Sequence, residues 1–137
     1  SKAYGASKEK SKITSIAELS KTGSVLKMSW IMNQGGDPAE KAFEAHGIYS
    51  YNPQLGSIVK QFQTSTGVLM NAVLISASNN KLLWERNADT PSGKLYEHCL
   101  FDFSEPNTFK HVILKRTLNG IPQVNEENET IILKRVK

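Results

Sequence analysis

Large apolar residues recur at every second position through most of this chain. They occupy the even positions of the run 26–32 and mostly the odd positions of 95–103. A period of two turns one face of a strand toward a core and the other toward water. β-Branched and aromatic residues are frequent in these runs and suit a pleated sheet. The pattern therefore predicts an all-β protein.

Short clusters of Gly, Pro, Asn, Asp and Ser separate the apolar runs, as turns require. Strands so closely spaced favour sequential antiparallel pairing, which is a meander. The predicted strands are 12–19, 24–32, 42–52, 56–65, 69–78, 81–87, 93–103, 108–118 and 129–137. Asp-Pro at 37–38 resembles a helix start and predicts one short helical piece from Asp37 to Lys41.

An open sheet of this size would leave two exposed edges. We therefore expect a meander of about 8–10 strands that forms a closed or nearly closed barrel, which can hold one small ligand. The 137 residues fit a single domain. Residues 1–11 are expected to be disordered or a trimmed start. The residues predicted to point inward are Met28, Trp30, Phe62, Trp84, Leu95, Phe101, Phe103 and Ile113.

Composition narrows the function classes. Hydrophobic residues make up 39% and charged residues 22%, which is ordinary for a globular protein. A net charge of +4 comes with basic residues near both ends but with no RNA-binding motif, zinc finger or basic helix, so we predict no nucleic-acid partner. No apolar run reaches the roughly 20 residues of a membrane helix. The compartment stays open between cytoplasm and periplasm or secretion, and a homodimer is an alternative to a monomer.

Four segments between Phe43 and Lys137 resemble a family of small β-barrel proteins of unknown function in the calycin group, related in fold to lipocalins and fatty-acid-binding proteins. They are FEAHGIYSYN at 43–52, QFQTSTG at 61–67, KRTLNG at 115–120 and LKR at 133–135. The resemblance implies a calycin-like barrel with an interior ligand site. The haem-binding relatives use a histidine late in the chain, and none follows His111, so no cofactor is expected. The Arg-x-Tyr clamp of fatty-acid-binding relatives is incomplete, because Val136 and Lys137 follow Arg135.

Two titratable residues interrupt apolar strand faces. Glu97 lies among Leu95, Cys99 and Phe101, and His111 lies between Phe109 and Ile113. A charged group on an inward face needs a partner. One interpretation is a polar handle for a ligand inside the barrel. The alternatives are a mutual Glu–His hydrogen bond or an exposed face.

Further ligand-binding candidates share strand faces with apolar residues. Arg86 lies on one face with Trp84 and could hold an anion or cover a barrel rim. Tyr49 and Trp30 complete the predicted ligand-binding set of Trp84, Arg86, Glu97, His111, Tyr49 and Trp30. Cys99 is predicted to be structural, since the adjacent His98 points to the opposite face.

No catalytic motif and no metal-site spacing of histidines is present, so we predict neither catalytic nor metal-binding residues. The leading hypothesis is non-catalytic binding of a small, largely apolar molecule in the barrel. One alternative is a small isomerase or hydrolase using Glu97 or His111. Another is an interaction module that pairs with its partner along a sheet edge.

Overall fold

The chain forms a strongly curved, ten-stranded antiparallel sheet in the computed structural model, which describes residues 11–34, 43–123 and 130–135. The strands are β1 (Ser11–Leu19), β2 (Val25–Gln34), β3 (Phe43–Asn52), β4 (Ser57–Thr64), β5 (Leu69–Ser78), β6 (Lys81–Thr90), β7 (Gly93–Asp102), β8 (Thr108–Leu118), β9 (Ile121–Pro122) and β10 (Thr130–Lys134). The predicted all-β meander is confirmed. The predicted helix at 37–41 and residues 1–10 of the predicted start lie outside the described residues, whereas Ser11 begins β1.

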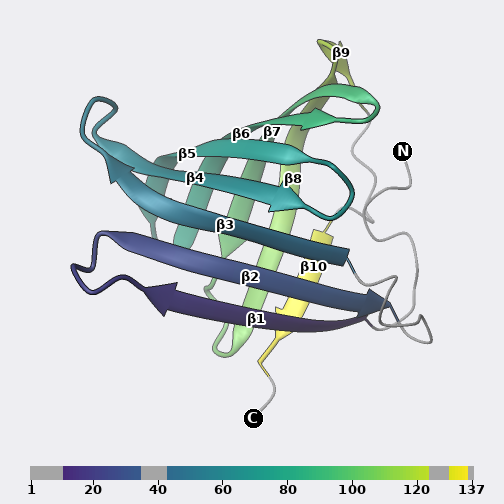
Figure 1. Ribbon diagram of the computed structural model, residues 1–137. Coiled ribbons are helices and arrows are strands. Elements are labelled where there is room, and N and C mark those ends of the chain that lie inside the picture. The colour runs from purple at the N-terminus through teal and green to yellow at the C-terminus, as the bar shows by residue number, and fades with distance from the viewer. Residues whose placement is uncertain (1–10, 35–42, 124–129, 136–137) are drawn as a thin grey trace.

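The strands follow one another in sheet order from β1 to β8, with β10 next to β8 and the short β9 also paired to β8. Figure 1 shows the sheet wrapping around, so that β1 to β3 face β8 and β10 across the interior. Among the described strands β1 pairs only with β2 and β10 only with β8, so hydrogen bonds do not close the barrel. The described part of the chain contains no helix that is long and apolar enough to cross a membrane.

Asparagine turns close two of the hairpins. Asn79 and Asn80 both have positive φ and connect β5 to β6, and Asn119 and Gly120 do the same between β8 and β9. Two-residue turns of this kind match the twist of paired strands. The first of these turns falls between the predicted strands 69–78 and 81–87, whereas β9 was not predicted.

A β-bulge in β8 changes which of its side chains face inward. Ile113 lies opposite Cys99, whereas Lys115 lies opposite His98, so Leu114 is the extra residue. Strand alternation therefore restarts after the bulge. Arg116, not Lys115, is turned toward the interior, opposite Glu97.

The core lies on the inner faces of β5 to β8. Its buried centre consists of Ala72, Trp84, Cys99, Phe101 and Ile113. Of the other residues predicted to point inward, Phe62 is buried and Met28, Trp30 and Leu95 are half-buried.

The prediction for Phe103 needs correction, because its side chain is 46% exposed. β7 ends at Asp102, so Phe103 lies beyond the strand. Its ring stacks on Phe109, with 5.0 Å between centroids. It therefore covers the end of the core and lies outside it.

Candidate ligand-binding site

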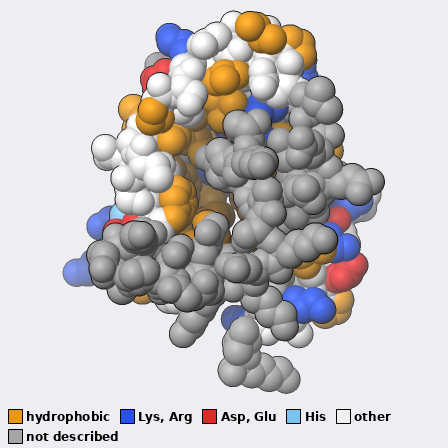
Figure 2. Space-filling model, turned by 90° about the vertical axis from the view of Figure 1, so that its right-hand side faces the viewer, with side chains coloured by type: hydrophobic (Ala, Val, Ile, Leu, Met, Phe, Trp, Pro, Cys, Tyr) orange, Lys and Arg blue, Asp and Glu red, His pale blue; other side chains and the backbone are white. Residues whose placement is uncertain are grey.

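The curved sheet encloses a cavity lined by side chains from β1 to β8 and from β10. A volume of about 120 Å³ is open to the centres of water molecules, several times the roughly 10–15 Å³ that one water needs. Figure 2 shows a hollow with hydrophobic side chains along it. The interior is therefore partly hollow, and most of its lining is aromatic or aliphatic.

Four of the six predicted ligand-binding residues line this cavity: Trp30, Tyr49, Arg86 and His111. Trp84 and Glu97 do not, because their side chains are fully buried within the wall. Trp84 still contacts the lining, since its ring lies 5.8 Å from that of Tyr49 and 6.0 Å from that of Phe101. Glu97 reaches the cavity only through its neighbours.

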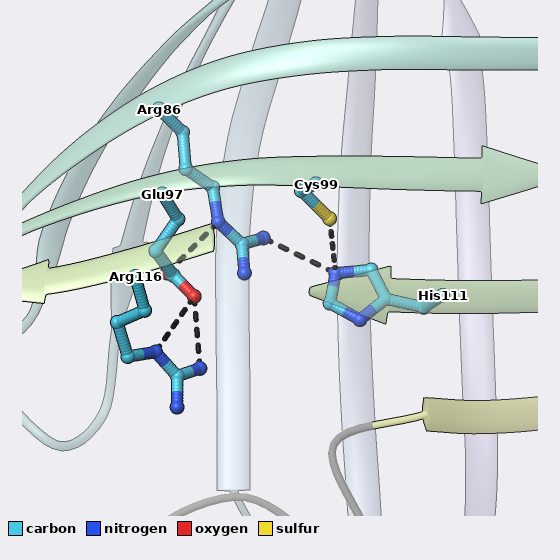
Figure 3. Close-up of polar contacts among 5 residues, drawn as sticks. All are labelled: Arg86, Glu97, Cys99, His111 and Arg116. Carbon is cyan, nitrogen blue, oxygen red and sulfur yellow. Dashed lines mark hydrogen bonds and ion pairs between the residues drawn. The ribbon is translucent and has the colours of Figure 1, made fainter. Parts of the chain in front are cut away.

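Glu97 is held between two arginines (Figure 3). Its Oε1 accepts a hydrogen bond from Arg86 Nε at 3.1 Å. Its Oε2 accepts two from Arg116, from Nε at 3.0 Å and from Nη2 at 2.8 Å. The three side chains are almost completely buried. The Glu–His hydrogen bond considered from the sequence is not formed, because both carboxylate oxygens accept from guanidinium groups.

The Nε2 atom of His111 accepts hydrogen bonds from two donors. Arg86 Nη1 lies 3.2 Å and Cys99 Sγ 2.9 Å from its Nε2 (Figure 3). A guanidinium can only donate, so Nε2 is an acceptor and the ring proton is on Nδ1. Burial, followed by the charges of Arg86 and Lys60, lowers the pKa of His111 from 6.5 to about 3. The imidazole is therefore neutral at physiological pH.

Cys99 has a histidine neighbour that strand alternation alone did not indicate. His98 does point away, as predicted, but His111 approaches from β8. Cys99 is completely buried, and burial raises the pKa of its thiol above the usual value of 9.0. A nucleophilic cysteine needs a lowered pKa and some access. The arrangement fits a structural cysteine that donates to His111.

Lys60 is the main residue of the site that sequence reasoning missed. Its side chain is only 3% exposed and lines the cavity. Its Nζ lies 4.1 Å from the ring centroids of both Trp84 and Phe101. The signal was present, because Lys60 alternates with the inward Phe62 on β4. Burial, followed by the charge of Arg86, lowers the pKa of Lys60 from 10.5 to about 7.

The other two histidines lie outside this site. His46 is exposed and pairs with Ser29 and Glu44, and His98 contacts the hydroxyl of Tyr96. Within residues 11–34, 43–123 and 130–135 there is no group of three or more His, Cys, Asp or Glu that could hold a metal ion. Besides the indole of Trp30, the polar side chains of the cavity lining are Tyr49, Lys60, Thr64, Arg86 and His111.

Comparisons with protein-family models, with curated proteins and with solved structures find no match to this chain. The calycin resemblance therefore stays a prediction, and the candidate site is defined by its geometry alone.

Proposed function

We propose that this protein binds a small, largely apolar molecule in the interior of its barrel and does not act on it chemically. The observation that carries the proposal is the cavity itself, enclosed by the inner faces of nearly all strands. Apolar walls with a few convergent polar groups are typical of small-molecule sites. The calycin-like barrel expected from the sequence supports the same proposal.

The aromatic lining supplies the surface for such a ligand. Ring contacts run through the wall from Trp30 to Phe62 to Tyr49, with centroids 6.2 and 5.5 Å apart. They continue through Trp84 and Phe101. Rings that already contact one another keep fixed orientations, so a ligand would lose little free energy in ordering them.

Two observations favour binding over catalysis. Both oxygens of Glu97 accept hydrogen bonds from arginines, so this carboxylate is not available as a base. The Nε2 of His111 faces Arg86 and Cys99. A general base must instead reach the proton that it removes from a substrate.

Chemical-shift mapping with a panel of small apolar acids, alcohols and aromatic compounds tests the proposal. We expect the largest shifts at cavity residues such as Trp30 and Met70. Ala45 lines the cavity, so Ala45→Leu should fill part of it and weaken binding by about tenfold or more. Glu44→Leu, one residue away on the exposed face, is the matched control. Shifts confined to the outer surface, or equal affinities for both variants, would refute interior binding.

A further inference from the structure

One buried cation beside the cavity, Lys60, has no carboxylate partner among the described residues. The buried charged side chains of the described residues are Lys60, Arg86 and Arg116, which are cationic, and Glu97, which is the one carboxylate. Glu97 accepts hydrogen bonds from both guanidinium groups. Buried charge is costly unless a partner of opposite sign compensates it. Among these four residues, Lys60 is the cation that forms no ion pair with Glu97.

The side chain of Lys60 lines the cavity. Among the described residues no carboxylate lies within ion-pair distance of its Nζ. Its neighbours are the faces of Trp84 and Phe101 and, at 5.6 Å, that of Tyr49. Aromatic faces offset part of the cost of burying an ammonium group but supply no full negative charge.

Three buried nitrogens in the same region also lack an acceptor. Trp30 Nε1, Trp84 Nε1 and His111 Nδ1 have no hydrogen-bond partner within the described parts of the chain. All three are donors, since the proton of His111 is on Nδ1. Buried donors are usually satisfied. Trp30 and His111 line the cavity, so this side of the interior offers donors and positive charge without the matching acceptors.

We propose that the ligand is an amphipathic carboxylate whose head group lies beside Lys60, within the field of Arg86, and whose apolar body contacts the aromatic and aliphatic lining. This inference rests on the proposed interior binding and names the class of ligand. The carboxylate would supply the missing negative charge and acceptor oxygens. Phe62, Met70, Ile131 and Leu133 would supply the apolar contacts.

Decanoate and decan-1-ol are matched probes, because they share an alkyl chain and differ in charge. At pH 6 we expect wild-type protein to bind decanoate at least about tenfold more tightly than decan-1-ol, by calorimetry or shift titration. In Lys60→Met the side chain keeps its length and loses its charge. This variant should lose the preference for decanoate, whereas Lys27→Met, at an exposed position of β2, should keep it.

The pH dependence of the wild-type protein gives a test that needs no variant. Decanoate is ionised throughout the range from pH 6 to 9, whereas Lys60, with a pKa of about 7, loses its proton within it. Of the groups that face Lys60, Arg86 stays charged, and the pKa of Tyr49 is raised to about 12 by burial. Burial raises the pKa of Cys99 and lowers that of His111, so both stay neutral.

Between pH 7 and 9 the affinity for decanoate should therefore fall by about tenfold or more, while that for decan-1-ol stays constant. Equal affinity of wild-type protein for the two probes at pH 6, or a full preference retained by Lys60→Met, would overturn the carboxylate assignment and leave interior binding standing. If neither the two probes nor the wider panel of compounds perturbs the cavity residues, the proposed interior binding itself is refuted.

Discussion

At the scale of single residues, Glu97 and its two arginines form a buried ion-pair cluster in which each charge depends on the others. Glu97→Gln would keep the shape and remove the charge that both guanidinium groups bind. Breaking a buried ion pair from one side costs about 3–5 kcal/mol, because the remaining charge is left uncompensated. We expect a loss of this size in the free energy of unfolding, measured by urea denaturation.

Glu105→Gln is the matched control for that substitution. Glu105 also forms a short ion pair, 2.7 Å from Lys110 Nζ, but its side chain is 60% exposed. Exposed pairs contribute about 1 kcal/mol or less. Similar losses for Glu97→Gln and Glu105→Gln would mean that Glu97 is hydrated in solution.

Lys60 should give the protein an unusual dependence of stability on pH. Its pKa of about 7 in the folded state is below the 10.5 of the unfolded chain, so the unfolded chain binds more protons between these pH values. Stability from this group therefore rises with pH across that window, and its burial is most costly below pH 7. Lys60→Met should be more stable than wild type at pH 6 by a few kcal/mol, and the advantage should shrink from pH 7 to 10.5.

Thermal or urea unfolding at several pH values measures this effect. Lys27→Met, at an exposed position of β2, is the matched control and should change stability by no more than about 0.5 kcal/mol at any pH. A constant difference between wild type and Lys60→Met from pH 6 to 10 would contradict a buried, easily deprotonated Lys60.

At the scale of the elements, alternation predicted the strands and their pairing but only part of the site. On β8 a strict period of two places Lys115 on the face of His111 and Ile113. The bulge at Leu114 instead brings Arg116 inward, opposite Glu97. Arg116 could not be found from the pattern, because a bulge adds one residue without interrupting the apolar run.

Lys60 shows a different limit of sequence reasoning. The alternation of β4 places it beside Phe62, a residue that was correctly predicted to be buried. A lysine in such a position is usually interpreted as exposed, because lysines are rarely fully buried without a partner. What favours its burial is the pair of rings from β6 and β7, and their approach depends on the curvature of the whole sheet.

Gly47 on β3 allows the close approach of β4 at this part of the barrel. A Cβ at this position would meet the backbone oxygen of Gln61 and come within 2.6 Å of Phe62 Cγ. Gly47→Ala should therefore force the two strands apart or displace Phe62, at a cost of about 1–3 kcal/mol or more. Urea denaturation measures the loss, and shift perturbations should centre on Phe62.

The control for Gly47→Ala is Gly67→Asn. Gly67 lies in the turn between β4 and β5 with a φ of +81°, and nothing lies within 4 Å of a Cβ built there. Asparagine tolerates this backbone conformation better than other residues with a side chain. A smaller loss for Gly67→Asn than for Gly47→Ala is expected, whereas the reverse order would show that turn geometry limits stability more than strand approach.

At the scale of the whole molecule, β1 and β10 are the two edges of the described sheet, and we expect the seam between them to open most readily. Ile13 on β1 and Ile131 and Leu133 on β10 line the same cavity, so the two edges meet across the interior without a shared ladder. The buried core lies in β5 to β8, so β1 is remote from it in the sheet and β10 borders it only through β8. Local opening at the seam therefore breaks fewer buried contacts than opening elsewhere.

Rates of amide hydrogen exchange should therefore increase from the core strands toward the seam. Exchange reports local opening, which is least favourable where buried apolar contacts are most numerous. The amides of β6 and β7, which carry Trp84 and Phe101, should exchange most slowly, and those of β1, where Ile16 and Leu19 are exposed, most rapidly. Uniform protection across the sheet would contradict an open seam.

A bound ligand and a second copy of the chain should change the exchange rates of the edge strands in different ways. A ligand that contacts Ile13 and Ile131 from inside the cavity joins both edges, so decanoate should slow exchange in β1 and β10 together and at any protein concentration. A dimer formed by strand addition at the free edge of β1 would slow exchange in β1 alone, and only as the concentration rises. Protection of both edges by ligand, with no dependence on concentration, is the outcome expected of a monomeric binding protein. Protection that rises with concentration in β1 alone would favour the interaction module, because paired backbone groups at that edge would then come from another chain.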